Sequence, residues 1–151
     1  MTAALVAFYR ARLDADEAVA RDATAGPWTT RNLGRHDGSA IVTDTGERTP
    51  LGLPVGQTLG SMHGPRGAAD GSHIARHDPA RVLAEVAAKR ETIRMWEEAV
   101  DFVEIAKSHG REATHYEVAA ESYLNVIRRD AAVHREHPEY DPSWAPEGVE
   151  R

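Results

Sequence analysis

Apolar residues recur at steps of three, four or seven in three stretches of the chain, a spacing that gives a helix one apolar face. The longest stretch begins at Asp78, which can cap a helix, and Pro79, which suits the first helical position. It ends at Gly110, a residue type common at helix C-termini. Its apolar positions are Val82, Val86, Ile93, Trp96, Val100 and Val103. The pattern predicts a helix of roughly 45 Å, at 1.5 Å per residue.

Two shorter stretches predict helices on either side of this one. Thr2 to Asp22 carries an apolar stripe opposite a largely acidic face, and Glu112 to His134 carries a second stripe through tyrosine and valine. Thr114 and Glu117 have the spacing of a capping box. Because only a short break at Gly110 separates the last two helices, we expect them to form an antiparallel hairpin.

The chain between residues 25 and 71 holds ten of the twelve glycines and four of the eight prolines, a composition that excludes long helices. Asp37-Gly38 is a strong hairpin signal, and Trp28 is the expected anchor of a small sheet. Gly56 to Asp70 has little apolar content and reads as a mobile loop. The expected strands are Trp28 to Asn32, Ser39 to Thr43 and Arg48 to Val55, with Ser72 to Ala75 as a short edge strand. Such a sheet needs a helix to cover it.

These elements predict an α+β fold: an N-terminal helix, a small antiparallel β-meander, a long central helix, and a C-terminal helix that forms an antiparallel hairpin with it. We expect a single α+β domain over residues 1–136, in which the N-terminal and central helices pack together. Residues 137–151 form a proline-rich tail, which Tyr140 and Trp144 can pin to the domain.

Charge and composition narrow the range of partners. The formal net charge of −6 disfavours nucleic acid as a partner. The absence of cysteine removes disulfides, thiolate metal sites and cysteine nucleophiles, and it is compatible with a reducing cytoplasm. No segment approaches the roughly 20 apolar residues that would span a membrane. The acidic polar face of the first helix also disfavours binding to a membrane surface. We therefore expect a cytoplasmic protein without a cofactor.

Three of these stretches resemble a family of small actinobacterial and actinophage proteins that is classed as a domain of unknown function. The stretches are LVAFYRARLDADEAVARDATAGPW (5–28), ADGSHIARHDPARVLAEVAAKR (69–90) and HPEYDPSWAP (137–146). Residues 91–132 look longer and more regularly helical than the family pattern, and they lack the cysteines associated with it. The resemblance implies a bacterial or phage cytosolic setting and supplies no catalytic residues.

A small-ligand site at the start of the central helix is the first candidate site. Arg76, His77 and Arg81 flank this helix start, where exposed N–H groups and two guanidinium groups can converge on an anion. The competing interpretation is structural: Asp78 caps the helix, and Arg81 pairs with Glu85 four residues later. We favour the structural interpretation.

A metal site is the second candidate, because the chain contains eight histidines. His134 and His137 are three residues apart at a helix end, and they need a third ligand such as His109 or His115. His73 and His77 are four apart, but the expected helix begins only after them. No Gly-x-Ser-x-Gly motif is present, and the glycine-rich segment 56–64 lacks the lysine of a phosphate loop.

The sequence therefore favours a non-catalytic accessory protein that acts by self-association or by binding another protein. The predicted hairpin, residues 93–133, carries more apolar surface than one chain is expected to cover. We expect a homodimer, or a larger even assembly, with Val100 and Val103 in the interface. The alternative is a nucleotide- or anion-binding protein, or a histidine-dependent metal enzyme.

Overall fold

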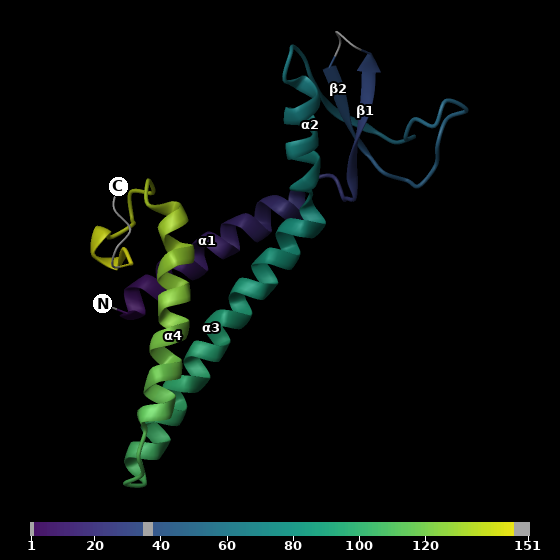
Figure 1. Cartoon of the computed structure of the whole chain (residues 1–151). Helices are drawn as coiled ribbons and strands as arrows, with labels where there is room; N and C mark the ends of the chain where they lie inside the picture. Colours follow the sequence, from purple (N-terminus) through teal and green to yellow (C-terminus); the bar gives the residue numbers. More distant parts are fainter. Residues whose placement is uncertain (1, 35–37, 147–151) are drawn as a thin grey trace. The chain divides into compact units, whose positions relative to one another are not determined.

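The computed structural model describes residues 2–34 and 38–146, and it confirms the predicted α+β order of elements (Figure 1). The elements are α1 (Thr2–Asp22), β1 (Trp28–Gly34), β2 (Gly38–Thr43), β3 (Thr58–Met62), α2 (Gly67–Arg76), α3 (Pro79–Ser108) and α4 (Thr114–Ala131), with 3-10 turns η1 (Ala132–His134) and η2 (Pro142–Trp144). The chain forms two compact units. Asp16–Glu85 makes one unit, and the first part of α1 joins the chain from Val86 onward in the other. The single domain over residues 1–136 stays a prediction.

The first unit, which we call the sheet unit, contains an antiparallel sheet with strand order β1-β2-β3. The central strand β2 is buried through Ala40, Ile41 and Val42. The predicted third strand at Arg48 to Val55 is wrong, because this segment folds back on itself through a single bridge between Arg48 and Pro54. Its prolines cannot donate to a ladder. The strand that pairs with β2 is β3, and Asp37 of the predicted hairpin signal lies outside the described residues.

Helix α2 covers the sheet and packs on all three strands (Figure 1). The predicted loop at Gly56 to Asp70 and edge strand at Ser72 to Ala75 are therefore wrong, since β3 and α2 occupy these residues. The buried face of α2 consists of Gly67, Gly71 and Ala75, four residues apart. At Gly71 a Cβ atom would lie 2.2 Å from the Oγ atom of Ser39. The helix lies so close to the sheet because its packing face has almost no side chains.

The start of α3 is held by Asp78, as predicted. Its Oδ1 atom accepts a hydrogen bond of 2.8 Å from the backbone N–H of Arg81, three residues later. The Oδ2 atom accepts a second bond, of 3.3 Å, from the backbone N–H of Trp28 at the start of β1. The Trp28 indole is half-buried and donates to the backbone oxygen of Thr24 at 2.9 Å. Asp78 thus joins a helix start to a strand start within the sheet unit.

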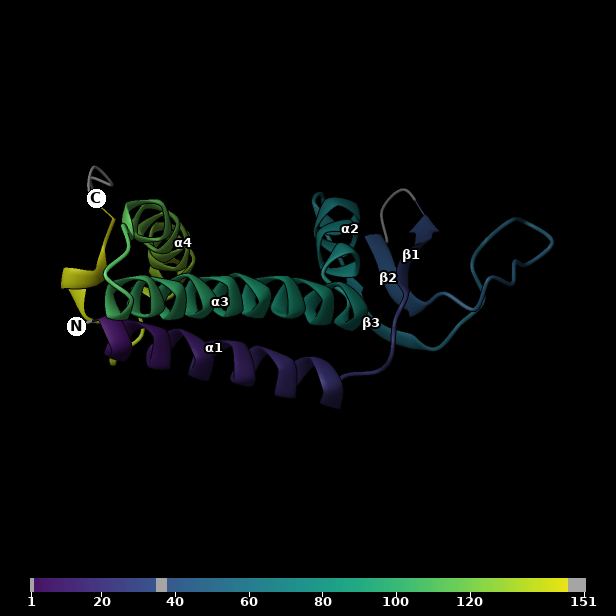
Figure 2. The ribbon, with the colours of Figure 1, turned by 90° about the horizontal axis from the view of Figure 1, so that it is seen from below.

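In the second unit, which we call the helical unit, α1 and α3 pack in antiparallel directions (Figure 2). Salt bridges of 2.6 Å join Arg10 to Glu97 and Asp14 to Arg90. The later residue of α1 pairs with the earlier residue of α3, so the two helices run in opposite directions. The largest fully buried side chains of this unit are Leu5, Tyr9, Leu13, Ile93 and Ile127. The predicted packing of the N-terminal helix on the long helix is confirmed.

The hairpin of α3 and α4 turns at Gly110, as predicted. Gly110 has a φ of 62°, and the N–H of Arg111 donates to the oxygen of Ala106 at 2.9 Å, which is the Schellman geometry of a helix end. The predicted capping box is wrong, because Ala113 holds the N-cap position without a side-chain bond. Ala113 is buried against Val103 and Ala106, so this position serves packing instead of capping.

The C-terminal tail is pinned as predicted. The Phe8 ring on α1 has ring centroids of His137, Tyr140 and Trp144 within 5.3–5.8 Å. Trp144 is 7% exposed and lies in η2, which Asp141 caps by accepting a 2.9 Å bond from the N–H of Ser143. This bond lowers the pKa of the Asp141 carboxyl. The tail is thus part of the helical unit up to residue 146.

Candidate functional site

The junction of α2 and α3 holds the predicted ligand residues Arg76, His77 and Arg81. Arg81 pairs with Glu85 at 2.7 Å and also donates to the backbone oxygen of Arg76 at 3.2 Å. The side chain of Arg76 has no hydrogen-bond or ion-pair partner among the residues that the structure describes. The structural interpretation of Arg81 is therefore confirmed, and Arg76 is the cation that stays available.

His77 turns toward its own helix. Its Nδ1 atom lies 2.8 Å from the backbone oxygen of His73, and the two imidazole centroids are 4.6 Å apart. The sequence analysis placed these two histidines before any helix, and this is wrong because α2 carries His73 and ends next to His77. Helical spacing brings the rings together, although both residues are exposed.

A cavity of about 360 Å³ opens beside this junction, within the sheet unit. It is lined by Trp28, Thr29, Thr30, Ser72, Ala75, Arg76, Asp78 and Arg81. Two of the three predicted ligand residues thus share one cavity, and His77 is not among its lining residues. The sequence indicates Trp28 only as the anchor of the sheet, and it does not indicate Ser72, because the helix that carries Ser72 was not predicted.

The predicted metal pair, His134 and His137, meets around an aromatic ring. Both imidazoles pack edge-on against Phe8, and the Nη1 atom of Arg12 lies 2.5 Å from Nε2 of His137. Because a guanidinium only donates, Nε2 uses its lone pair to accept this bond. His115 lies near the opposite end of α4, roughly 30 Å from His134 at 1.5 Å per residue. Across residues 2–34 and 38–146, no group of three or more His, Asp or Glu is arranged to hold a metal.

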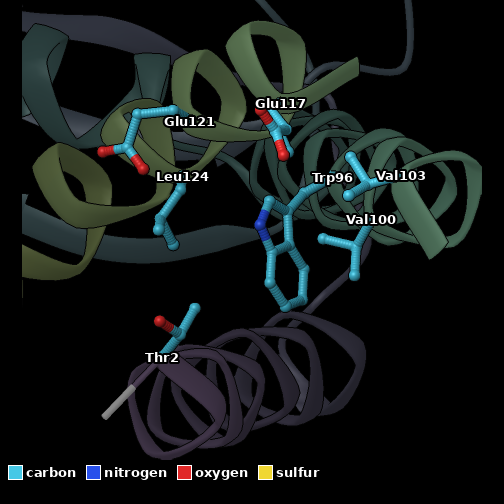
Figure 3. Close-up of a pocket in the computed structure, with 8 residues that line it drawn as sticks. Thr2, Trp96, Val100, Val103, Glu117, Glu121 and Leu124 are labelled. Carbon is cyan, nitrogen blue, oxygen red and sulfur yellow. The ribbon is translucent and has the colours of Figure 1, made fainter. Parts of the chain in front are cut away.

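One groove of the helical unit lies between the start of α1 and the hairpin (Figure 3). It has a volume of about 310 Å³, and Trp96 projects into it from α3. Val100 and Val103 line the same groove, and Val103 is only 8% exposed. Val103 is thus buried within its own unit, whereas the half-buried Val100 lines the groove. The role of these two valines in an interface between chains stays a prediction.

Two carboxylates border this groove from α4, and both are neutralised by neighbours. Glu117 pairs with Lys107 at 2.8 Å and Glu121 pairs with Arg128 at 2.7 Å. The hydrogen bond with Glu117 raises the pKa of Lys107. The first pair connects α3 to α4 and the second lies within α4, so both carboxylates have a structural role that does not require a ligand.

A second groove, of about 280 Å³, lies at the hairpin tip, and we call it the tip groove. It is lined by Phe102, Ile105, Ala106, His109, Arg111, Glu112 and Tyr116. Phe102 and Ile105 are 49% and 53% exposed, and the Phe102 ring stacks on Tyr116 with centroids 5.2 Å apart. The sequence analysis missed Phe102 and Ile105, because each lies one position away from the buried stripe through Val103 and Ala106.

Opposite charges stand next to each other at the tip groove. Arg111 and Glu112 are consecutive residues between α3 and α4, and both are exposed. Neither side chain has an ion-pair partner in the described part of the chain. The tip groove therefore combines exposed apolar side chains with one unpaired cation and one unpaired anion.

Comparison with known proteins places the chain in a family without assigning an activity. A family model described as a family of unknown function, DUF6221, matches residues 2–146, a range that contains all three stretches of the noted resemblance. No curated protein and no solved structure matches the chain. Within the described residues, no helix is long and apolar enough to cross a membrane. Because the family model covers nearly the whole chain, this protein belongs to the DUF6221 family of unknown function.

Proposed function

We propose that this protein is a non-catalytic accessory protein that acts by self-association through the tip groove of its helical hairpin. The observation that carries this proposal is the exposure of Phe102 and Ile105 beside Tyr116. Single exposed apolar residues are common on protein surfaces, whereas several that line one groove indicate an interaction site. A bacterial or phage cytosolic setting, implied by the family resemblance, is part of the same proposal.

A second copy of the chain is the occupant that the charges favour. In a twofold dimer every contact occurs twice: if one residue contacts a second residue of the other copy, that second residue contacts the first in return. Arg111 of one copy can then lie opposite Glu112 of the other, and Glu112 of the first opposite Arg111 of the second. The pairing would satisfy both unpaired charges at once and would leave Phe102 and Ile105 of the two copies to pack against each other. A partner with one uniform charge would leave one of these residues facing a like charge.

The exposed area predicts reversible association. An aromatic or large aliphatic side chain presents roughly 200 Å² when unburied, so the half-exposed Phe102 and Ile105 offer about 200 Å² per copy. Burying this surface on both copies contributes on the order of 10 kcal/mol at about 25 cal/mol per Å². Association costs roughly 4–15 kcal/mol of lost freedom, so the dimer is expected to form in a concentration-dependent way.

Single acidic substitutions on the hairpin surface test this proposal. Phe102→Glu and Ile105→Glu place a charge in the tip groove, and because both residues are half-exposed the fold should persist. Val118→Glu is the matched control, since Val118 is 63% exposed on the same hairpin and does not line the groove. Sedimentation velocity over a concentration series should show a dimer for the parent and for Val118→Glu, and a monomer for the two groove variants. A parent that stays monomeric at high micromolar concentration overturns the proposal.

A further inference from the structure

The cavity of the sheet unit contains an aromatic ring held in a fixed position. The backbone N–H of Trp28 donates to Asp78, and the indole Nε1–H donates to the oxygen of Thr24 at 2.9 Å. The Nε1–H bond restricts the indole ring, and the backbone bond fixes the part of β1 that carries it, so Trp28 lines the cavity in a defined position. A preorganised indole can contact a flat ligand ring with little further loss of side-chain freedom.

The same cavity contains polar groups that lack partners. Among the described residues, neither the guanidinium of Arg76 nor the hydroxyl of the half-buried Ser72 has a hydrogen-bond partner. Asp78 is the acidic residue of the lining, and its two oxygens already accept bonds from the N–H groups of Arg81 and Trp28. Arg81 is neutralised by Glu85. Arg76 and Ser72 are therefore two groups of the lining that can donate hydrogen bonds to an anionic oxygen.

We propose that this cavity binds a small molecule in which one flat ring carries a phosphate or a carboxylate. The ring lies against Trp28, the anion accepts bonds from Arg76, and the Ser72 hydroxyl donates to one of its oxygens. Arginine binds both kinds of anion through its planar fork of donors. The volume of about 360 Å³ is at the small end of ligand pockets, which limits the ligand to about one ring with one anionic group. The site is separate from the tip groove, so self-association is not needed for it.

Four probe compounds separate the contributions of ring and anion. The full chain is titrated with phenyl phosphate, benzoate, inorganic phosphate and phenol, while NMR follows the indole N–H resonance of Trp28. We expect phenyl phosphate or benzoate to bind at least tenfold more tightly than phosphate, which supplies only the anion, and phenol, which supplies only the ring. The tighter of the two identifies the preferred anion. Failure of both to bind more tightly than the fragments overturns the proposal.

Matched arginine variants test the location of the site. Arg76→Ala should weaken the tighter probe at least tenfold, with circular dichroism unchanged. Arg66→Ala is the control, because Arg66 precedes the same helix, is exposed and does not line the cavity. Unchanged binding in Arg76→Ala overturns the proposal. Equal weakening in both variants also overturns it, since this would show general attraction to positive charge.

Discussion

Asp78→Ala is the most informative single change in the sheet unit, because one carboxylate satisfies the first turn of α3 and the first residue of β1. The bond from the N–H of Arg81 is 2.8 Å long, and loss of such a helix cap costs about 1 kcal/mol. The bond from the N–H of Trp28 is longer, at 3.3 Å, and contributes about 0.5–1 kcal/mol. We therefore expect Asp78→Ala to lower the free energy of unfolding by about 1.5–2 kcal/mol.

A graded series separates the two bonds. Serine caps helices nearly as well as aspartate, but its single hydroxyl is too short to reach Trp28 as well. Asp78→Ser should therefore lose only the smaller part of the stability. Urea unfolding followed by far-UV circular dichroism measures the difference, and about 1.5 kcal/mol shifts the midpoint by roughly 0.5–1.5 M. Hydrogen exchange at the Arg81 amide reports the cap directly.

Unfolding of Asp78→Ala at the same urea concentration as the parent would contradict this role of Asp78. If serine is as destabilising as alanine, the helix cap contributes nothing to stability and the bond to Trp28 accounts for the whole effect.

Two further changes probe packing, with thermal unfolding as the measurement for both. Gly71→Ala should lower the free energy of unfolding by about 1–3 kcal/mol although alanine favours helices, because its Cβ would lie 2.2 Å from the Oγ of buried Ser39. Gly60→Ala should change the stability little, because nothing lies within 4 Å of the added carbon. Tyr140→Phe should leave stability unchanged or raise it by about 1 kcal/mol, because the Tyr140 hydroxyl is buried without a partner among the described residues. Burial, and secondarily Asp141, raises the pKa of Tyr140, so the parent should lose stability as pH rises above about 10 and the variant should lose less. Equal stability of the two glycine variants, or a marked loss in Tyr140→Phe, would contradict these assignments.

Elements with local chemical signals could be predicted from the sequence. Asp78 followed by Pro79 marks a helix start through its own side chain and ring, and Gly110 marks a helix end through a backbone angle that few other residues adopt. Neither depends on a distant partner. The start and end of the long helix, together with the apolar stripe between them, were enough to predict the helical part of the α+β fold.

Elements defined by a distant surface could not be predicted in this way. Helix α2 has no apolar stripe, because Gly67 and Gly71 are the residues that let it approach the sheet. The sequence signal for α2 is the four-residue spacing of Gly67, Gly71 and Ala75. This spacing indicates a helix only when it is known that these small residues pack against β2. For the same reason the sequence does not reveal the cavity beside Trp28, and it does not show that Val103 of the apolar stripe is buried within one chain. The exposed neighbours Phe102 and Ile105 are the better candidates for an interface.

The central claim, reciprocal self-association at the tip groove, is tested most directly by mixing two charge-reversal variants. Arg111→Glu alone places acidic side chains opposite each other in a twofold dimer, and Glu112→Arg alone places basic ones there. Light scattering should show each purified variant as a monomer at a concentration where the parent is dimeric, while an equimolar mixture should regain the mass of a dimer. Variants that dimerise alone as well as the parent does, or a mixture that stays monomeric, would contradict the account.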